Sequence, residues 1–189
     1  MKPNSLDDWL DYIDLNRPKE DEFGLNRLRP ITDIIFQSKI AEKIVVIGGT
    51  NGKGTTAEVL NNLLQESNFK VGLYTSPHLF NFNERIRING FPVSNSEILS
   101  AFEGIETIKK NSRLTYFDYA TLAAFIIFAK NNLDVAILEI GLGGRHDPVN
   151  LVDPDISVLT NVELDHQKWL GNTREQIGEE KSAIFREGK

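Results

Sequence analysis

The chain has 189 residues, of which 40% are hydrophobic and 25% charged, and these are the proportions of an ordinary globular protein that can bury a core. A net charge of -6 argues against a nucleic-acid-binding protein, and the lack of cysteine excludes disulfides and thiolate metal sites, so any metal must bind oxygen or imidazole ligands, a choice that suits magnesium. The N-terminus has no apolar signal segment and no apolar run is long enough for a membrane span, so we expect a cytoplasmic protein without a membrane partner.

Two helices are expected ahead of the first strand. Apolar residues at helical spacing over 6–13, behind a capping Ser5, predict a short amphipathic helix. Residues 18–23 are interpreted as a polar loop. A second apolar pattern over 25–35 predicts another helix, with Pro30 as a candidate break.

A phosphate-binding loop is the strongest functional signal in the sequence. The β-branched run 44–47 predicts a strand, and it ends in closely spaced glycines around Lys53. Glycines let backbone N–H groups turn onto an anion, the lysine adds a positive charge, and Thr55 or Thr56 offers a hydroxyl to magnesium. A helix over 55–67 would direct the positive end of its dipole at the same anion. The residues predicted to surround the nucleotide are Gly49, Thr50, Asn51, Gly52, Lys53, Gly54, Thr55 and Thr56.

The spacing of this loop differs from that of the common P-loop. Three residues separate Gly48 from Gly52, and Gly54 stands between Lys53 and the hydroxyl of Thr55. The alternative interpretation is a glycine turn between strand and helix that carries an exposed lysine. The strand-loop-helix context favours the phosphate loop.

A second strand, predicted over 71–74, runs directly into the segment 75–78. Open α/β sheets bind ligands at the carboxyl ends of their parallel strands, so Ser76 and His78 are candidate site residues. A serine before proline is also a common turn former, and both interpretations stay open at this point.

The stretch 79–91 is too polar for a core segment. We expect either a solvated hairpin or a lid lined by Glu84 and Arg85. A capping box formed by Ser94 and Glu97 then predicts the start of an amphipathic helix.

A far more apolar helix is predicted over 116–131, buried against the sheet, with Thr115 and Phe117 as its cap and hydrophobic staple. It leads to a strand over 135–140 whose only charged residue is Glu139. A carboxylate at the end of a buried strand is costly unless something pairs with it. Glu139 is therefore either a magnesium ligand beside the phosphate loop or a partner in a structural ion pair.

The glycine-rich run 141–145 fails as a dinucleotide fingerprint because His146 occupies its sixth position. We expect its glycines to let the backbone approach a ligand closely. A fourth strand over 156–159 precedes His166, which is either a metal ligand or acid–base group, or a surface histidine.

A last helix is predicted from its cap Thr173 to Ile184, and on it Lys181 alone is interpreted as a solvated lysine. Residues 185–189 look like a helix end on glycine, where an α/β protein would start its next strand. We therefore expect a truncated chain.

Taken together, these pieces resemble the folylpolyglutamate synthase/dihydrofolate synthase family, within the Mur-ligase superfamily of ATP-dependent amide ligases. The resemblance covers nearly the whole chain, and the ordered set of motifs is very specific. The matching segments are 9–13, 24–27, 49–55, 75–79, 84–86, 88–90, 138–145 with Asp147 and Asn150, 164–166, 169–171 and 180–184.

The resemblance implies a site for ATP and magnesium. By the family pattern, Lys53 and the loop amides hold the β- and γ-phosphates. Thr55 and Glu139 would bind one magnesium ion, and Ser76, Glu139 and His166 would surround a second. These implied roles concern the phosphates and metals alone.

The resemblance also implies a modification and an acceptor site. Lys181 would be an N6-carboxylysine that organises the metals, and it completes a catalytic set with Lys53, Glu139 and His166. The sequence departs from the family around Asp147 and over 161–163, which affects the pterin side more than the ATP site. The expected substrate-binding residues are Ser76, Pro77, His78, Glu84, Arg85, Thr115, Phe117, Arg145 and Asp147.

We therefore expect an α/β chain with a three-layer P-loop-type fold, in which a mostly parallel sheet lies between helices. Residues 1–189 would form the N-terminal part of the ATP-binding Mur-ligase central domain, without the C-terminal glutamate-binding domain. The whole ligase is expected to join L-glutamate to the carboxylate of dihydropteroate or tetrahydrofolate through an acyl phosphate, and to be a monomer. The fragment alone is expected to be inactive. The alternatives are a catalytically silent magnesium-nucleotide-binding module and a Mur-type ligase that acts on a cell-wall precursor.

Overall fold

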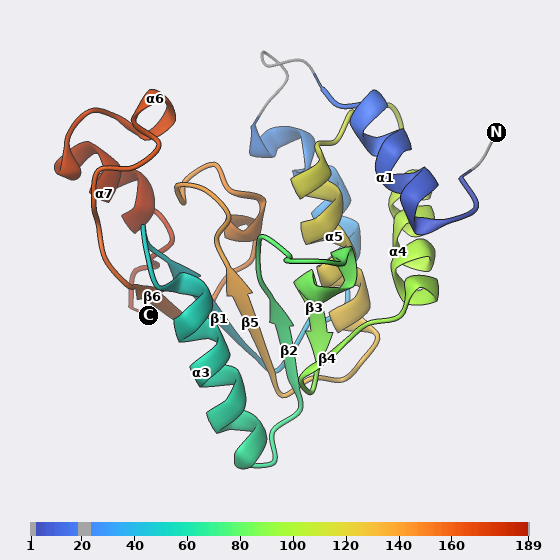
Figure 1. Cartoon of the computed structure of the whole chain (residues 1–189), viewed down its shortest axis with the longest axis horizontal. Helices are drawn as coiled ribbons and strands as arrows, with labels where there is room; N and C mark the ends of the chain where they lie inside the picture. The colour runs from blue at the N-terminus through green and yellow to red at the C-terminus, as the bar shows by residue number, and fades with distance from the viewer. Residues whose placement is uncertain (1–2, 19–23, 189) are drawn as a thin grey trace.

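The computed structural model describes residues 3–18 and 24–188, which are organised around a six-stranded sheet of order β4-β3-β2-β5-β1-β6 (Figure 1). β2, β5, β1 and β6 are parallel, whereas β3 runs antiparallel to β2, and β4 antiparallel to β3. The four predicted strands are confirmed to within one residue at each end. The strands are β1 (Lys43–Gly48), β2 (Val71–Tyr74), β3 (Ile86–Ile88), β4 (Phe91–Pro92), β5 (Val135–Glu139) and β6 (Ile156–Leu159).

Helices cover both faces of the sheet, as the predicted three-layer α/β fold requires. On one face α3 packs its Ala57 and Leu60 against apolar side chains of β1, β2 and β5. On the other face α1, α2, α4 and α5 enclose the larger core (Figure 1). The helices are α1 (Leu6–Leu15), η2 (Leu25–Arg27), α2 (Arg29–Ile35), α3 (Lys53–Glu66), η3 (Phe82–Arg85), α4 (Asn95–Ile108), α5 (Tyr116–Ala129), η4 (Pro148–Leu151), α6 (Gln167–Leu170) and α7 (Arg174–Ser182).

The helix starts predicted from capping residues are confirmed, because the capping side chains make the expected bonds. Ser5, Ser94, Thr115 and Thr173 each accept the backbone N–H of the residue three positions later, and that residue's side chain accepts in return. α5 is buried on almost every side, as its apolar sequence predicts. None of the helices within residues 3–18 and 24–188 has the length and apolarity needed to cross a bilayer.

One local prediction needs correction, and another is untested. Pro30 does not break a helix, because it lies in the first turn of α2, where its missing N–H would have no partner anyway, and the interruption lies at Leu28, between the end of η2 and the start of α2. The loop predicted over 18–23 lies, from residue 19 on, outside the described residues.

The stretch 79–91 was expected to be too polar for a core segment, and this expectation is wrong for its middle. Phe82, Arg85 and Ile86 are buried, and β3 within this stretch pairs with β2, so the segment extends the sheet. The hairpin interpretation holds for β3 and β4, whose strands pair with each other. Burial arises because Phe82 packs its ring on Phe102 and Tyr116.

Candidate functional site

The four parallel strands bring their carboxyl ends to one edge of the sheet, and the predicted site residues follow them. The register pairs Ile47 of β1 with Glu139 of β5, and Gly48 with Leu159 of β6. The phosphate loop, Glu139 and the segment after β6 therefore lie side by side. This edge is where open α/β sheets bind ligands.

The phosphate loop adopts backbone angles that two of its glycines make accessible. Gly49 has a φ of +142° and Gly52, the residue before α3, has a φ of +79°. A Cβ on Gly49 would also lie 1.9 Å from the hydroxyl oxygen of Thr160. α3 begins at Lys53, two residues earlier than predicted, so its first free N–H groups belong to the loop itself.

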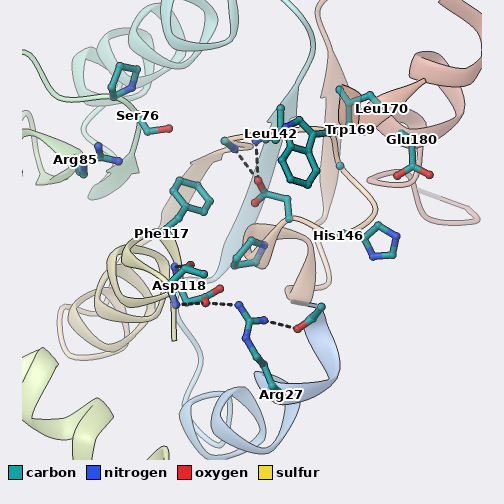
Figure 2. Close-up of a pocket in the computed structure, with 18 residues that line it drawn as sticks. Arg27, Ser76, Arg85, Phe117, Asp118, Leu142, His146, Trp169, Leu170 and Glu180 are labelled. Carbon is teal, nitrogen blue, oxygen red and sulfur yellow. Dashed lines mark hydrogen bonds and ion pairs between the residues drawn. The ribbon is translucent and has the colours of Figure 1, made fainter. Parts of the chain in front are cut away.

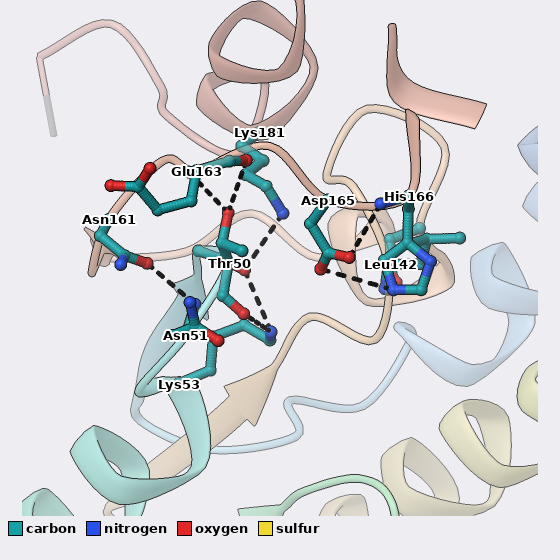
Figure 3. A network of polar contacts seen from close by, with 11 residues as sticks. Thr50, Asn51, Lys53, Leu142, Asn161, Glu163, Asp165, His166 and Lys181 are labelled. Atoms are coloured by element: carbon teal, nitrogen blue, oxygen red, sulfur yellow. Dashed lines mark hydrogen bonds and ion pairs between the residues drawn. The ribbon is translucent and has the colours of Figure 1, made fainter. Parts of the chain in front are cut away.

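Two lysines converge on one carbonyl of this loop (Figure 3). Lys53 donates from Nζ to the carbonyl oxygens of Gly49 at 3.0 Å and Thr50 at 3.2 Å, and Lys181 of α7 donates to the same Gly49 oxygen at 3.1 Å. Lys181 is buried, so its interpretation as a solvated lysine is wrong. Burial lowers the pKa of Lys181, the neighbouring Lys53 lowers it further, and Asp165 raises it.

The segment after β6 holds the outer part of the loop in place. The backbone oxygen of Asn161 accepts the N–H of Thr50 at 3.0 Å, and its side-chain oxygen accepts the N–H of Asn51 at 2.8 Å. Thr160 donates its hydroxyl to the Asn51 carbonyl at 2.7 Å. Sequence reasoning noted Asn161 only as a departure from a family pattern, and the amide type of this side chain was the one available signal.

Glu139 is a buried carboxylate that contacts the loop after β2, the strand beside β5 in the sheet. Its Oε2 accepts the backbone N–H of Ser76 at 2.9 Å, and Gly54 of the phosphate loop lies against the same carboxylate. Burial raises the pKa of Glu139, while the Ser76 N–H and Lys53 lower it and Glu58 raises it. The structure thus joins Ser76, Glu139 and the loop into one cluster.

His166 lies at the edge of this cluster. Its backbone is left-handed, with a φ of +47°, and its N–H bonds to the Asp165 side chain at 2.8 Å (Figure 3). In the described chain no hydrogen bond or ion pair joins His166 to Ser76 or Glu139. The structure therefore places the predicted second metal ligand beside Asp165.

A cavity of about 800 Å³ opens beside Ser76, between the start of α5 and the loop after β5 (Figure 2). Six of the predicted substrate-binding residues line it, namely Ser76, Pro77, Arg85, Thr115, Phe117 and Asp147. The rest of its lining lies outside the predicted substrate-binding set, although the glycines within 141–144 belong to the run expected to approach a ligand. The remaining lining residues are Gly24, Arg27, Asp118, Gly141, Leu142, Gly143, Gly144, His146, Pro148, Trp169, Leu170 and Glu180.

Asp147 lines this cavity, and both of its carboxylate oxygens accept hydrogen bonds. Oδ2 accepts the N–H groups of Gly141 and Leu142, and Oδ1 accepts that of Val149, all at 2.9 Å. Burial raises the pKa of Asp147 to about 7, against the opposing effect of the three N–H donors, and Asp118 raises it further. Burial thus favours the protonated form of this acid, whereas the three N–H donors favour the carboxylate.

Arg85 presents a cation to the same cavity from an aromatic cage. Its guanidinium carbon lies 5.9 Å from the centre of the Phe82 ring and 5.3 Å from that of Tyr116. Nε donates to His78 Nδ1 at 2.8 Å, so this nitrogen of His78 acts as the acceptor. Burial lowers the pKa of His78, as does Arg85. His78 itself lines a separate cavity of about 330 Å³.

Two other predicted substrate residues lie outside the cavity lining. Glu84 accepts the N–H groups of Leu79 at 2.7 Å, Phe80 at 3.0 Å and Asn81 at 2.7 Å, so it organises its own loop. Arg145 pairs through Nε with Glu180 of α7 at 3.0 Å. Both side chains hold loops that border the site.

The first turn of α5 and the glycine run fit each other. Phe117 does not act as a helix staple, because its ring faces the cavity and lies 6.1 Å from the Tyr74 ring. A Cβ on Gly141 would come within 2.4 Å of that Phe117 ring, and one on Gly144 within 2.7 Å of the Glu180 carbonyl. These glycines thus allow close approach of protein groups, and because Gly141 and Gly144 also line the cavity, their expected approach to a ligand stays a prediction.

The family model described as the Mur ligase middle domain matches residues 47–189. The chain is 45% identical over 185 residues to a dihydrofolate synthase/folylpolyglutamate synthase of Buchnera aphidicola subsp. Baizongia pistaciae, a match that covers 98% of this chain and 43% of that relative. E. coli FolC in complex with DHPP and ADP is similar with a TM-score of 0.95 and 42% identity, over 98% of this chain and 45% of that one. A bifunctional folylpolyglutamate synthase/dihydrofolate synthase with Mn, AMPPNP and L-glutamate bound has a TM-score of 0.92 and 42% identity, over the same shares. The chain thus spans less than half the length of these relatives.

Proposed function

Because the Mur ligase middle domain model matches three quarters of the chain, the chain belongs to the Mur ligase family, and we propose that it is the nucleotide-binding part of an ATP-dependent ligase. This ligase would join L-glutamate to the carboxylate of a folate-type acceptor. The relatives support the proposal, since the E. coli structure holds DHPP and ADP, and the one with Mn and AMPPNP also holds L-glutamate. Residues 1–189 would form the N-terminal part of the central domain.

One observation carries the proposal: the Ser76 N–H donates to Glu139, and Ser76 also lines the cavity. Glu139 also lies against Gly54 of the phosphate loop, so this bond links the loop to the cavity. A carboxylate that enters from the cavity would therefore meet the terminal phosphate at the bond between Ser76 and Glu139. This is the geometry that a carboxylate-activating enzyme needs.

The chemistry that fits this arrangement is acyl activation. An oxygen of the acceptor carboxylate attacks the γ-phosphorus of ATP, ADP leaves, and the amine of glutamate then displaces phosphate from the acyl phosphate to form the amide. Such phosphoryl transfer depends on in-line positioning and on neutralising charge, so no nucleophilic side chain is required. Lys53 supplies positive charge at the loop, and Arg85 supplies it in the cavity.

The residues present fit a magnesium ion that is shared with phosphate oxygens. The described residues contain no group of three or more His, Asp or Glu that could hold a metal unaided. Magnesium commonly binds through one or two carboxylates together with phosphates and waters, and Oε1 of Glu139 has no hydrogen-bond donor in the described chain. Glu139 and the Thr55 hydroxyl would hold the ion, which would neutralise phosphate charge. Ser76 and His166 are proposed for a second ion.

The proposed N6-carboxylation of Lys181 has support from its environment. Carboxylation requires the neutral amine, because the ε-nitrogen lone pair attacks carbon dioxide and a proton is then lost. Burial and the nearby Lys53 lower the pKa of Lys181 and so favour that neutral form. The proposed partners of the whole ligase are small molecules, either dihydropteroate or tetrahydrofolate, together with L-glutamate. A monomeric state and a cytoplasmic location stay predictions.

The proposal is tested by measuring two affinities on this chain by calorimetry, for magnesium-ATP and for dihydropteroate. We expect both ligands to bind and Lys53→Ala to weaken ATP binding about tenfold or more, since a lost charged contact costs roughly 1.5–3 kcal/mol. Lys39→Ala, which removes an exposed lysine paired with Glu42, is the matched control and should change neither affinity.

Two results would contradict the proposal. A chain that binds ATP but neither dihydropteroate nor tetrahydrofolate would be a nucleotide-binding module only. Equal ATP affinity for Lys53→Ala and the unaltered chain would remove the phosphate role of the loop. In the whole ligase, glutamate-dependent ADP release measures the reaction itself, and a comparison of dihydropteroate with tetrahydrofolate identifies the acceptor.

A further inference from the structure

A buried ion pair joins the N-terminal segment to the wall of the cavity. Arg27, the last residue of η2, donates from Nη2 to Oδ2 of Asp118 in α5 and from Nη1 to the Gly24 carbonyl (Figure 2). The side chains of Arg27 and Asp118 are 17% and 2% exposed. The pair thus bridges two segments that lie 91 residues apart in the sequence.

Asp118 is at the same time the helix-capping acid of α5. Oδ2, the oxygen that binds Arg27, also accepts the N–H of Thr115 at 2.6 Å, and the N–H of Asp118 donates to the Thr115 hydroxyl at 3.0 Å. The guanidinium and the cap therefore share one carboxylate oxygen. The orientation of the first turn of α5 depends on this shared contact.

That first turn carries part of the cavity wall. Thr115 and Phe117 line the cavity. The Phe117 ring packs directly on the backbone of Gly141, where it leaves no room for a Cβ. At the other end of α5 the helix is fastened separately, since Phe125 packs on Phe36 with ring centres 5.3 Å apart. Loss of the ion pair would thus loosen the end of α5 at the cavity and leave the far end packed.

We propose that Arg27 and Asp118 are positioning residues for the acceptor, which fix Thr115 and Phe117 at the cavity wall through the capping contact; this inference rests on the proposed function. A buried ion pair adds little net stability compared with apolar side chains, yet removal of one partner leaves a charge without compensation. Without Arg27, the Asp118 carboxylate would be buried with the cap alone. The Asp118 carboxylate would then turn toward solvent or become protonated, and the turn of α5 that it caps would shift.

The pair also has a matched control in the chain. Arg87 of β3 pairs with Glu58 of α3, and the arginine side chain is 19% exposed, close to the 17% of Arg27. The side chain of Glu58 is 41% exposed, whereas that of Asp118 is only 2% exposed. Neither Arg87 nor Glu58 lines the cavity. Arg87 resembles Arg27 further, because the Nε atom of each is buried without a hydrogen-bond partner in the described chain. Arg87→Gln thus removes a comparable ion pair elsewhere on the sheet.

The experiment measures the affinities of the chain for dihydropteroate and for magnesium-ATP in Arg27→Gln, Asp118→Asn, Arg27→Lys and Arg87→Gln. We expect Arg27→Gln and Asp118→Asn to weaken dihydropteroate binding about tenfold, because small displacements of positioning groups have effects of that size or larger, with ATP binding unchanged. Arg27→Lys keeps the charge without the planar fork and should recover part of the loss. Arg87→Gln should leave both affinities unchanged.

Each other result overturns the inference. If Arg27→Gln binds dihydropteroate as tightly as Arg87→Gln does, the pair has no positioning role, and the proposed function still stands. If Arg27→Gln and Arg27→Lys both lose ATP and dihydropteroate binding in parallel, the pair is a general support of the fold. If the unaltered chain binds neither dihydropteroate nor tetrahydrofolate, the proposed function fails and the inference fails with it.

Discussion

The buried acid of the cavity should make the stability of the chain fall as the pH rises. Asp147 has a pKa of about 7 in the folded chain, against an ordinary value of 3.8. Between these two values the folded chain binds more protons than the unfolded chain, so the free energy of unfolding decreases with increasing pH. Above about pH 7 the carboxyl is ionised in both states and its contribution no longer changes.

The size of this effect follows from the two pKa values. They differ by about three units, and each unit corresponds to about 1.4 kcal/mol, so Asp147 should remove about 4 kcal/mol of stability between about pH 4 and pH 7. Full burial of the side chain means that solvent does not screen the effect away. A folded domain typically has an unfolding free energy of about 5–15 kcal/mol. A loss of about 4 kcal/mol is close to the lower end of that range.

The assay is urea unfolding of the unaltered chain and of Asp147→Asn, at pH values from 4.5 to 8 in steps of about half a unit. The difference in unfolding free energy between the two proteins isolates Asp147, because the other acids titrate in both. We expect this difference to fall steadily with pH and to level off above about pH 7. A difference that is constant, or that rises with pH, would refute the reasoning and would mean that the three N–H donors keep Asp147 ionised.

Glu84 provides a control of opposite sign. The N–H groups of Leu79 and Asn81 lower the pKa of Glu84 below its ordinary value of 4.5. Its stabilising contribution is therefore present above about pH 4.5 and is lost as the pH falls further. The difference between the unaltered chain and Glu84→Gln, measured down to pH 3, should increase with pH where the Asp147 difference decreases.

Two further changes test the site. Glu139→Gln should abolish ligation in the whole ligase and raise the unfolding free energy of this chain at neutral pH, because a neutral amide replaces a buried carboxylate whose pKa burial raises. ADP release measures the first effect and urea unfolding the second. A variant that is both less stable and fully active would contradict the prediction. Gly144→Ala should destabilise the chain by about 1–3 kcal/mol, because the new Cβ would meet the carbonyls of Glu180 at 2.7 Å and Lys181 at 2.8 Å; a melting temperature equal to that of Gly178→Ala, where the nearest neighbour is 3.8 Å away, would argue against it.

The strands and helix starts could be predicted because their causes are local. A β-branched run such as 44–47 and a cap such as Ser94 act on neighbouring residues, so the pattern of a few positions decides the outcome. The same local logic predicted where polar residues follow strands, since parallel strands end at one edge. It made Ser76 and Glu139 candidate site residues, and the resemblance to the family placed both around one metal ion; the structure shows that they contact each other.

The missed features all depend on partners far away in the sequence. In the sequence Arg27 resembles any other polar residue, and its importance comes from its ion pair with Asp118, which lies far along the chain. The sequence around Arg85 is polar, but Phe82 and Tyr116 enclose its guanidinium, so the segment joins the core. Lys181 is buried only because α7 packs over the phosphate loop. Spacing rules contain no information about such contacts.

The charges at the edge of the sheet are hard to explain by stability alone. Glu139 is buried with one N–H donor, and Lys53 and Lys181 bring two positive charges to a single carbonyl. Each of these arrangements opposes folding, because burial disfavours a lone charge and like charges repel. A polyphosphate placed among them would supply the negative charge that the lysines lack, and a shared cation would supply the partner that Glu139 lacks. The cost to the fold is thus the property that would give the site its affinity for a magnesium-bound nucleotide.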